Sequence, residues 1–439
     1  MIPVLSFALL AAWATAAVLG LRMLLRQRAA GAAVFVFACV AVAAQAAASL
    51  IPVGIGEPLI RLSILQFVLA ATGALMAGSL VGIRMRVPGD RIVIVAAVLG
   101  VPMAVGALWM LSVASTPPRE RERDAVLRPI ALPPGFRLNI YADAASVPAV
   151  EGAFDNPTVM TFGEDGIFVA DIAGNIWRGA DADGDGRVDA LHKYADGFQL
   201  LVGLAWRDGE LYVSSAGKIE ALRDSNGDGR ADARRILVKN LPTMVLQPHS
   251  NNSLTFGPDG RLYFGVGSTV AGGPEPQPLA GAILSTNPDG GDVRVEARGF
   301  GNPFEIAFNT AGAMFAGDNQ AGEVNDEFNY IVPGGDYGPG GDRAPIAAFP
   351  VHSTPTGLTF YDGVMFPRAY RGTMFAALWM RGEVVNLELT AGRDGAYSAR
   401  PNVFASGFLY PVDVVAGPDG ALYIADFGTS TVYRVRYGA

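Results

Sequence analysis

Hydrophobic residues follow two different patterns along the chain, and the change lies near Ser115. Before this point, four apolar stretches contain no charged residue: 3–21, 29–53, 62–83 and 92–113. Each has roughly the 20 residues that an α-helix needs to cross the hydrocarbon layer of a membrane. The pattern therefore predicts a bundle of four transmembrane α-helices over residues 1–115, followed by a charged juxtamembrane linker over 116–130.

The charges between these stretches predict their orientation. The first loop contains Arg22, Arg26 and Arg28, and the third contains three more arginines, whereas the second has only Glu57 and Arg61. Because arginine-rich loops remain on the cytoplasmic side, we expect both termini on the opposite side. In a bacterium that side is the periplasm. A cleaved signal peptide accounts for the first stretch alone, so a multi-pass protein of the inner membrane is expected.

From about residue 130 onward, short β-rich runs alternate with turns rich in Gly, Asp and Asn, and no amphipathic helical pattern persists. One theme recurs six times: an apolar strand, a turn that is Asp-Gly in most copies, and a second apolar strand. The copies lie at 159–171, 203–215, 253–267, 306–318, 357–379 and 414–426. Their spacing suits one four-stranded blade per copy, and it predicts an all-β six-bladed β-propeller over 131–439.

Composition and charge narrow the classes of function. The 439 residues carry a net charge of −8, of which +5 belongs to the first 115 residues and −13 to the rest. Such an acidic propeller argues against nucleic-acid binding, which needs a basic face. Cys39, the only cysteine, lies inside an apolar stretch. Disulfides, a CxxC redox motif and a CxxCH haem site are therefore excluded.

Two short segments share a pattern of oxygen-bearing side chains. They carry Asp or Asn at positions 1, 3, 5 and 9 and Gly at position 6, which can wrap a hard cation such as Ca²⁺. Position 12 holds His192 or Arg235 instead of the Glu of an EF-hand. The alternative is an Asp-rich hairpin turn that needs no metal, but the matched pair favours a structural ion. The predicted ligands are Asp181, Asp183, Asp185, Asp189, Asp224, Asn226, Asp228 and Asp232.

Two further segments carry candidate chemistry. His249 precedes the third copy, at the point where a strand would begin at the mouth of the propeller, and polar residues surround it. The alternative is an ordinary surface or core histidine. A dense run of carboxylates, amides and glycines covers 317–329 and continues at 333–338. Such a run is typical of a loop that coordinates a ligand, although acidic loops are often only solvated.

With these residues in view, the chain resembles the pyrroloquinoline-quinone (PQQ) dependent glucose, sorbosone and pyranose dehydrogenases over roughly 133–437. The resemblance is carried by LPPGFRLNIYA at 132–142, His249 with SLTFGPDGRLYFGVGS at 253–268, Gly301-Asn302-Pro303 with 318–338, and the segments 354–367 and 411–426. It implies a six-bladed propeller that oxidises a sugar or polyol hydroxyl. It also implies PQQ and Ca²⁺ as cofactors.

The resemblance assigns roles to individual residues. His249 would be the general base that takes a proton from the sugar hydroxyl, a task that suits a neutral imidazole. Calcium would act as a Lewis acid on the quinone. The implied calcium ligands are the backbone carbonyls of Ala321 and Gly322, and Gln320 is implied to lie beside the cofactor. A second cation is implied at Asp326, Glu327 and Tyr337.

The sequence departs from the family pattern at the cofactor's carboxylates. The family has arginine where this chain has Gly301, and again just before the last Asp-Val strand, where it has Leu409-Tyr410-Pro411. Each lost charge-assisted partner costs about 2 kcal/mol, so losing two would weaken PQQ binding roughly a thousandfold. The cations in nearby loops that could take their place are Lys239, Arg298 and Arg381. Asn302, Arg298 and Arg381 are predicted, with Gln320, to bind the cofactor.

Two principal hypotheses follow. In the first, the chain is a membrane-tethered, extracytoplasmic dehydrogenase of a sugar or polyol. It would pass electrons to a membrane quinone or to a separate cytochrome. In the second, it is a calcium-stabilised propeller that has lost PQQ and serves as a periplasmic binding or sensing module. A hydrolytic, lactonase-like propeller is a third possibility. Gln45 and Gln66 could contact a quinone head group, but hydrogen bonds between helices are the simpler interpretation.

Overall fold

The computed structural model describes residues 129–243, 250–270, 275–393 and 395–438. The chain divides into two units, Met1–Arg119 and Glu120–Ala439. The four predicted transmembrane helices lie outside the described residues, so they stay a prediction. Within the described ranges, no helix is long and apolar enough to cross a membrane. Three short 3-10 helices occur there: η1 (Ala144–Ser146), η2 (Arg368–Tyr370) and η3 (Trp379–Arg381).

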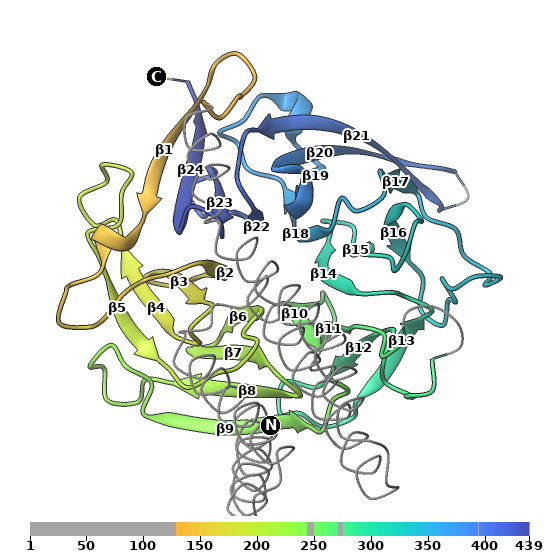
Figure 1. Ribbon diagram of the computed structural model, residues 1–439, viewed down its shortest axis with the longest axis horizontal. Helices are drawn as coiled ribbons and strands as arrows, with labels where there is room; N and C mark the ends of the chain where they lie inside the picture. Colours follow the sequence, from red (N-terminus) through yellow and green to blue (C-terminus); the bar gives the residue numbers. More distant parts are fainter. Residues whose placement is uncertain (1–128, 244–249, 271–274, 394, 439) are drawn as a thin grey trace, which may run out of the picture. The chain divides into compact units, whose positions relative to one another are not determined.

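The second unit is a ring of six four-stranded antiparallel sheets around a common centre, as the sequence predicts (Figure 1). Blade one is β2 (Pro157–Gly163), β3 (Gly166–Asp171), β4 (Ile176–Ala180) and β5 (Ala190–Ala195). Blade two is β6 (Gly203–Arg207), β7 (Glu210–Ser215), β8 (Lys218–Arg223) and β9 (Ala233–Lys239). Blade three is β10 (Asn251–Phe256), β11 (Leu262–Val266), β12 (Ala282–Thr286) and β13 (Arg294–Arg298).

The remaining blades follow the same order, except that the last recruits the first strand of the ring. Blade four is β14 (Pro303–Phe308), β15 (Met314–Asp318), β16 (Asp326–Ile331) and β17 (Ala347–Phe349). Blade five is β18 (Pro355–Tyr361), β19 (Thr373–Leu378), β20 (Glu383–Ala391) and β21 (Tyr397–Ser406). Blade six is β22 (Pro411–Ala416), β23 (Leu422–Asp426), β24 (Thr431–Tyr437) and β1 (Phe136–Ala142).

Strand β1 closes the ring, because it pairs with β24 from the other end of the unit (Figure 1). The register runs from Phe136 opposite Tyr437 to Ile140 opposite Tyr433. Each backbone hydrogen bond made here joins residues some 300 positions apart in the sequence. The segment that resembles the family's opening strand is therefore the closing strand of this propeller.

The Asp-Gly turns form as expected, and two of them show why both residues are needed. Gly260 and Gly420 adopt φ of 80° and 82°, values that glycine reaches without steric cost. Asp259 accepts a hydrogen bond from the Tyr263 hydroxyl at 3.0 Å, and Asp419 accepts one from Tyr423 at 3.1 Å. The aspartate thus ties the turn to the strand that follows it.

The first strand of each blade lies nearest the centre, and its chain direction defines two ends of the ring. We call the end where first strands begin and second strands finish the upper mouth, and the opposite end the lower mouth. Apolar side chains pack between neighbouring blades, as where Phe168 of blade one stacks on Trp206 of blade two at 5.1 Å. The acidic run, expected as one loop, is instead a hairpin, because Asp318 ends β15 and Asp326 begins β16.

Candidate functional site

Most of the predicted mouth residues lie at the upper mouth, on blades three and four. His249 lies outside the described residues, and it precedes Asn251, the first residue of β10, by two positions. Asn302 directly precedes β14, and Gln320 follows β15 by two residues. The described part of the site is therefore built from strand ends that two neighbouring blades bring to the same mouth.

Hydrogen bonds join these residues into a continuous chain, which we call the polar chain. Asn252 donates from Nδ2 to Asn302 Oδ1 at 2.8 Å, and the Asn302 backbone N–H donates to Asp318 Oδ1 at 2.7 Å. Gln320 donates from Nε2 to Asp318 Oδ2 at 2.7 Å and from its backbone N–H to Asp326 Oδ1 at 2.8 Å. The sequence-predicted Asn302, Gln320 and Asp326 are thus brought together, and Asp318, which joins them, was not predicted.

Three carboxyl groups at this mouth have raised pKa values. Burial raises the pKa of Asp318 to about 7, even though the N–H groups of Gly301 and Asn302 oppose the shift. Burial also raises the pKa of Asp326 and of Glu327. Desolvated carboxylates that repel one another are stabilised by a cation, because its charge lowers the cost of ionisation. The donor set fits a hard divalent ion here.

Several buried polar atoms near the start of β10 have no hydrogen-bond partner among the described residues. They are Asn252 Oδ1, Ser253 Oγ and Ser215 Oγ. Asn252 and Ser253 follow His249 closely in the chain, and Ser215 ends the second strand of the neighbouring blade. A buried polar atom without a partner costs about 1–3 kcal/mol, so such a group is expected to bind water or a ligand.

At the two positions where the family pattern has arginine, Gly301 is closed by packing and Leu409 lies against a glycine. A Cβ atom at Gly301 would lie 2.7 Å from the Asn319 carbonyl oxygen and 3.2 Å from Gln320 Cα, so no side chain fits there. Leu409 packs so closely on Gly428 that a Cβ atom at Gly428 would lie 2.4 Å from Leu409 Cγ. The loss of both arginines is therefore part of a coherent local structure.

The two arginines predicted to replace them have partners on the rim. Arg298 is exposed at the end of β13 and donates to the Pro278 carbonyl at 3.2 Å. Arg381, in η3, forms an ion pair with Glu383 with an Nε–Oε2 distance of 2.8 Å. Neither contact belongs to the polar chain, and the cofactor role of both arginines stays a prediction.

An aromatic cluster on blades five and six adjoins the polar chain. Trp379 and Tyr410 stack with ring centroids 5.2 Å apart at 25°, and Phe427 lies 4.9 Å from Trp379. The Trp379 backbone N–H donates to the Thr354 carbonyl oxygen. The Thr354 backbone N–H in turn donates to Asp326 Oδ2 at 2.8 Å. Tyr410 remains 37% exposed. We call Trp379, Tyr410 and Phe427 the aromatic platform, a feature that sequence reasoning missed because it needs two blades in register.

Other predicted metal ligands lie in varied settings. The Tyr337 hydroxyl donates to the Tyr330 carbonyl at 2.6 Å and accepts from the Val332 N–H at 2.9 Å, so it fastens a turn. Ala321 and Gly322 are exposed between β15 and β16. Glu327, on β16, accepts from Asn329 Nδ2 at 3.3 Å. The part that these four residues play in binding a cation stays a prediction.

The two Asp-rich loops connect β4 to β5 and β8 to β9, at the lower mouth. In both, the first aspartate accepts from backbone N–H groups of its own loop: Asp181 from Gly184 and Gly186, and Asp224 from Gly227, Asp228 and Gly229. Carboxylate oxygens of Asp181, Asp183 and Asp185 lie within 4.8 Å of one another. The other predicted ligands each accept a backbone N–H within their own loop: Asp183, Asp185, Asp189, Asn226, Asp228 and Asp232.

Both loops also dock on the outermost strand of the preceding blade. The Val188 N–H donates to the Tyr141 carbonyl of β1 at 2.8 Å, and the Ala231 N–H donates to the Tyr194 carbonyl of β5 at 2.9 Å. These loops lie at the opposite end of the sheets from the polar chain. Their placement favours a structural role, and the first loop secures the strand that closes the ring.

Comparisons with known proteins agree with this fold. A family model described as a domain of unknown function (DUF7133) matches residues 122–339. A search of curated proteins gives no match. Among solved structures, an oxidoreductase (glucose dehydrogenase) from Thermus thermophilus is 25% identical, with a TM-score of 0.54, covering 69% of this chain and 100% of its own.

Two further solved structures share the fold at lower identity. The PQQ-bound form of aldose sugar dehydrogenase from Streptomyces coelicolor is 19% identical, with a TM-score of 0.55, covering 70% of this chain and 99% of its own. The holo form of the pyranose dehydrogenase PQQ domain from Coprinopsis cinerea is 14% identical, with a TM-score of 0.57, covering 71% and 97%. The structural neighbours of this chain are thus six-bladed sugar dehydrogenases.

Proposed function

We propose that this chain is a dehydrogenase that oxidises a hydroxyl group of a sugar or polyol, with Ca²⁺ and PQQ as cofactors. Its N-terminal segment would anchor it in the inner membrane, with the propeller on the periplasmic side. The observation that carries the proposal is the polar chain at the upper mouth, in a fold whose neighbours are sugar dehydrogenases. A membrane quinone or a separate cytochrome would take the electrons.

The residues of the upper mouth suit the recognition of a polyhydroxylated substrate. Amides can both donate hydrogen bonds to hydroxyl groups and accept them, and carboxylates accept them. His249, which precedes Asn252 by three residues in the sequence, would accept the proton of the reacting hydroxyl. The Ala321 and Gly322 carbonyls would hold Ca²⁺ close to Gln320, and Asp326, Glu327 and Tyr337 would hold a second cation. PQQ would supply the redox chemistry when bound.

The upper mouth does not fit the carboxylates of PQQ in the way that the resemblance implies. Gly301 has no room for a side chain, and Leu409 is committed to packing against Gly428. Segments 244–249 and 271–274, which lie outside the described residues, contain no lysine or arginine. Arg298 and Arg381 are the candidates to meet the cofactor, and each would have to leave its present partner.

This misfit favours a second candidate function, a sugar-binding or sensing module without PQQ. Tyr410 of the aromatic platform belongs to the Leu409-Tyr410-Pro411 segment, where the family has arginine, so this segment offers a ring face and no positive charge. A neutral sugar ring presents apolar C–H faces to aromatic rings and hydroxyls to polar groups. The acidic mouth accepts such a neutral ligand more readily than an anionic one.

Turnover separates the two candidates. The purified full chain, given Ca²⁺, PQQ and an artificial electron acceptor, is expected to oxidise members of a sugar and polyol panel. Replacing His249→Ala should lower kcat about 10²- to 10⁴-fold, the usual loss when a general base is removed. His192→Ala, which alters an exposed histidine at the lower mouth, is the matched control and should leave kcat unchanged.

Two results would contradict the dehydrogenase proposal. One is the absence of turnover with every substrate at saturating PQQ and Ca²⁺. The other is equal activity of the His249→Ala and His192→Ala variants. Sugar binding without turnover would support the second candidate.

A further inference from the structure

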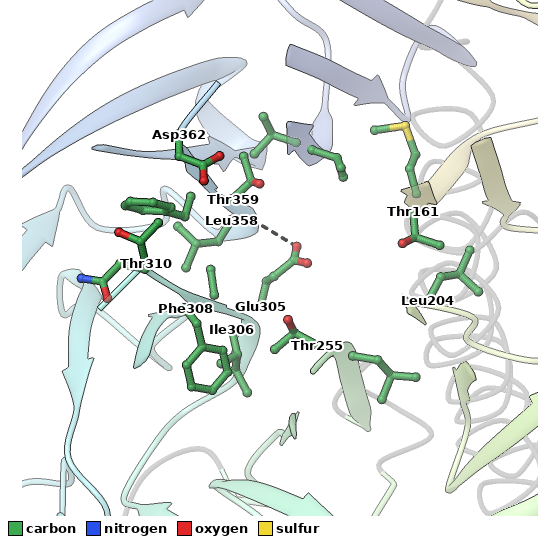
Figure 2. Close-up of a pocket in the computed structure, with 17 residues that line it drawn as sticks. Thr161, Leu204, Thr255, Glu305, Ile306, Phe308, Thr310, Leu358, Thr359 and Asp362 are labelled. Atoms are coloured by element: carbon green, nitrogen blue, oxygen red, sulfur yellow. Dashed lines mark hydrogen bonds between the residues drawn. The ribbon is translucent and has the colours of Figure 1, made fainter. Parts of the chain in front are cut away.

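A cavity of about 380 Å³ lies in the lower part of the central channel. The first strands of all six blades line it, through Met160, Leu204, Leu254, Ile306, Leu358 and Val414. Figure 2 shows the Glu305 carboxyl pointing into this space, with a hydrogen bond to Leu358. A carboxyl group inside the ring of first strands needs a specific partner, because desolvating an unpaired charge is costly.

The repeat places the partner of Glu305 two blades away. Glu305, Gly357 and Asp413 occupy the same position in β14, β18 and β22, one residue before Ile306, Leu358 and Val414. Gly357 lies between the two acids, and a Cβ atom there would come within 2.7 Å of Asp413 Oδ1. The glycine thus leaves the space through which the carboxyl groups of Glu305 and Asp413 bond to each other.

Backbone N–H groups take up the remaining oxygens of the pair. Asp413 accepts from the Met160 N–H at 2.6 Å and from the Val414 N–H at 2.7 Å. Glu305 accepts from the Leu358 N–H at 3.1 Å. First strands border the channel and have no further strand to pair with on that side, so these carboxyls serve as their acceptors. Both oxygens of Asp413 accept, so the proton between the two carboxyls belongs on Glu305.

In the described part of the chain, no cation lines this space to balance two negative charges. Among the described residues that line the cavity, none is lysine, arginine or histidine, and the only other acid is the exposed Asp362. Of the adjoining first strands, β6 ends in Arg207, whose guanidinium bonds to the Gly260 carbonyl, and β18 ends in Tyr361, whose hydroxyl bonds to the Gly420 carbonyl. Two adjacent carboxylates without a counter-charge do not both ionise.

We propose that Glu305 and Asp413 form a binding site for a single proton, shared between blades four and six across Gly357. Through their bonds to Leu358 and Met160, the pair links blades four, five, six and one around the channel. It lies away from the polar chain of the upper mouth and does not depend on the proposed dehydrogenase activity.

The proton has a defined effect on stability. Burial, strengthened by the neighbouring Asp413, raises the pKa of Glu305, and burial raises that of Asp413 to about 6. The folded state therefore keeps a proton that the unfolded chain releases near its ordinary carboxyl pKa. The stability linked to this proton is present at acid pH and is lost as the pH rises through the folded pKa values. In the intermediate range, the folding equilibrium constant falls about tenfold per pH unit for each proton retained.

The test compares urea unfolding of the full chain between pH 5 and pH 9 in the wild type, Glu305→Gln and Asp362→Asn. The glutamine amide can donate to Asp413 at every pH. The slope of unfolding free energy against pH should therefore decrease by the contribution of one proton, and at pH 9 this variant should unfold at a higher urea concentration than the wild type. Asp362→Asn, which changes an exposed acid of the same cavity, should keep the wild-type slope. Equal slopes in all three proteins would overturn the proposal.

Infrared spectroscopy tests the proton without relying on stability. At pH 7 the wild type should show protonated-carboxyl absorption, in addition to that of Asp318, which Glu305→Gln lacks and Asp362→Asn retains. A spectrum unchanged by Glu305→Gln would contradict the proposal. If that variant does not fold, loss of one such band from the wild type on raising the pH to 9, in step with its fall in stability, is expected instead. A wild type with no protonated carboxyl at pH 7 would overturn it.

Discussion

Blades four and six begin in the same way, and the comparison separates what the repeat supplies from what single residues add. In each blade, an aspartate at the end of the second strand accepts hydrogen bonds from the two backbone N–H groups that precede the proline of the first strand. The contacts are Gly301 and Asn302 to Asp318 at 3.1 and 2.7 Å, and Leu409 and Tyr410 to Asp426 at 2.9 and 2.8 Å.

The side chains placed by this shared backbone differ completely. Blade four presents the amide of Asn302 to the polar chain, and blade six presents the ring of Tyr410 to Trp379. The repeat therefore delivers a side chain to the upper mouth at a fixed place, and each substitution decides its chemistry. A substitution at such a place alters the ligand that the mouth prefers while leaving the fold intact.

The largest expected effect breaks the shared backbone. Asp318→Ala and Asp426→Ala each remove the acceptor of at least two backbone N–H groups, and each orphaned group costs about 1–3 kcal/mol. We expect each variant to lose about 2–6 kcal/mol of unfolding free energy, measured by urea denaturation of the full chain. The corresponding asparagine variants keep one acceptor oxygen and should lose less. Alanine variants as stable as the wild type would show that the two turns do not depend on these aspartates.

A smaller effect sharpens the difference between the blades. Tyr410→Ala removes one ring of the aromatic platform, and an aromatic contact contributes about 0.5–1.5 kcal/mol. Sugar affinity, measured by calorimetry on the full chain, should fall roughly three- to tenfold. Tyr410→Phe keeps the ring and should bind like the wild type. Unchanged affinity in the alanine variant would mean that the platform only supports the fold.

The sequence predicts the repeated features of the molecule well, because each depends on neighbouring residues. The six copies and their turns, such as the one at Gly260, form as expected. Asn302, Gln320 and Asp326 also meet, because the resemblance names them on adjacent strand ends. The pairing of Glu305 with Asp413 could not be predicted, since it requires the register between three blades and a glycine between them.

The closed arginine positions illustrate the same limit. A sequence shows that arginine is missing at Gly301, but only the approach of Asn319 shows that no side chain fits. Likewise, the stacking of Tyr410 on Trp379 joins residues 31 positions apart in different blades. Local pattern determines the blades, and contacts between blades determine the chemistry at their ends.

The central claim is that the upper mouth binds PQQ with Ca²⁺, despite the loss of two arginines. The most direct measurement is a titration of the purified full chain with PQQ, with and without Ca²⁺, followed by absorbance and thermal unfolding. Calcium-dependent binding with a micromolar or lower Kd is the predicted result. It would mean that Arg298, Arg381 and the polar chain replace the missing partners. No spectral or thermal change at saturating PQQ and Ca²⁺ would contradict the claim.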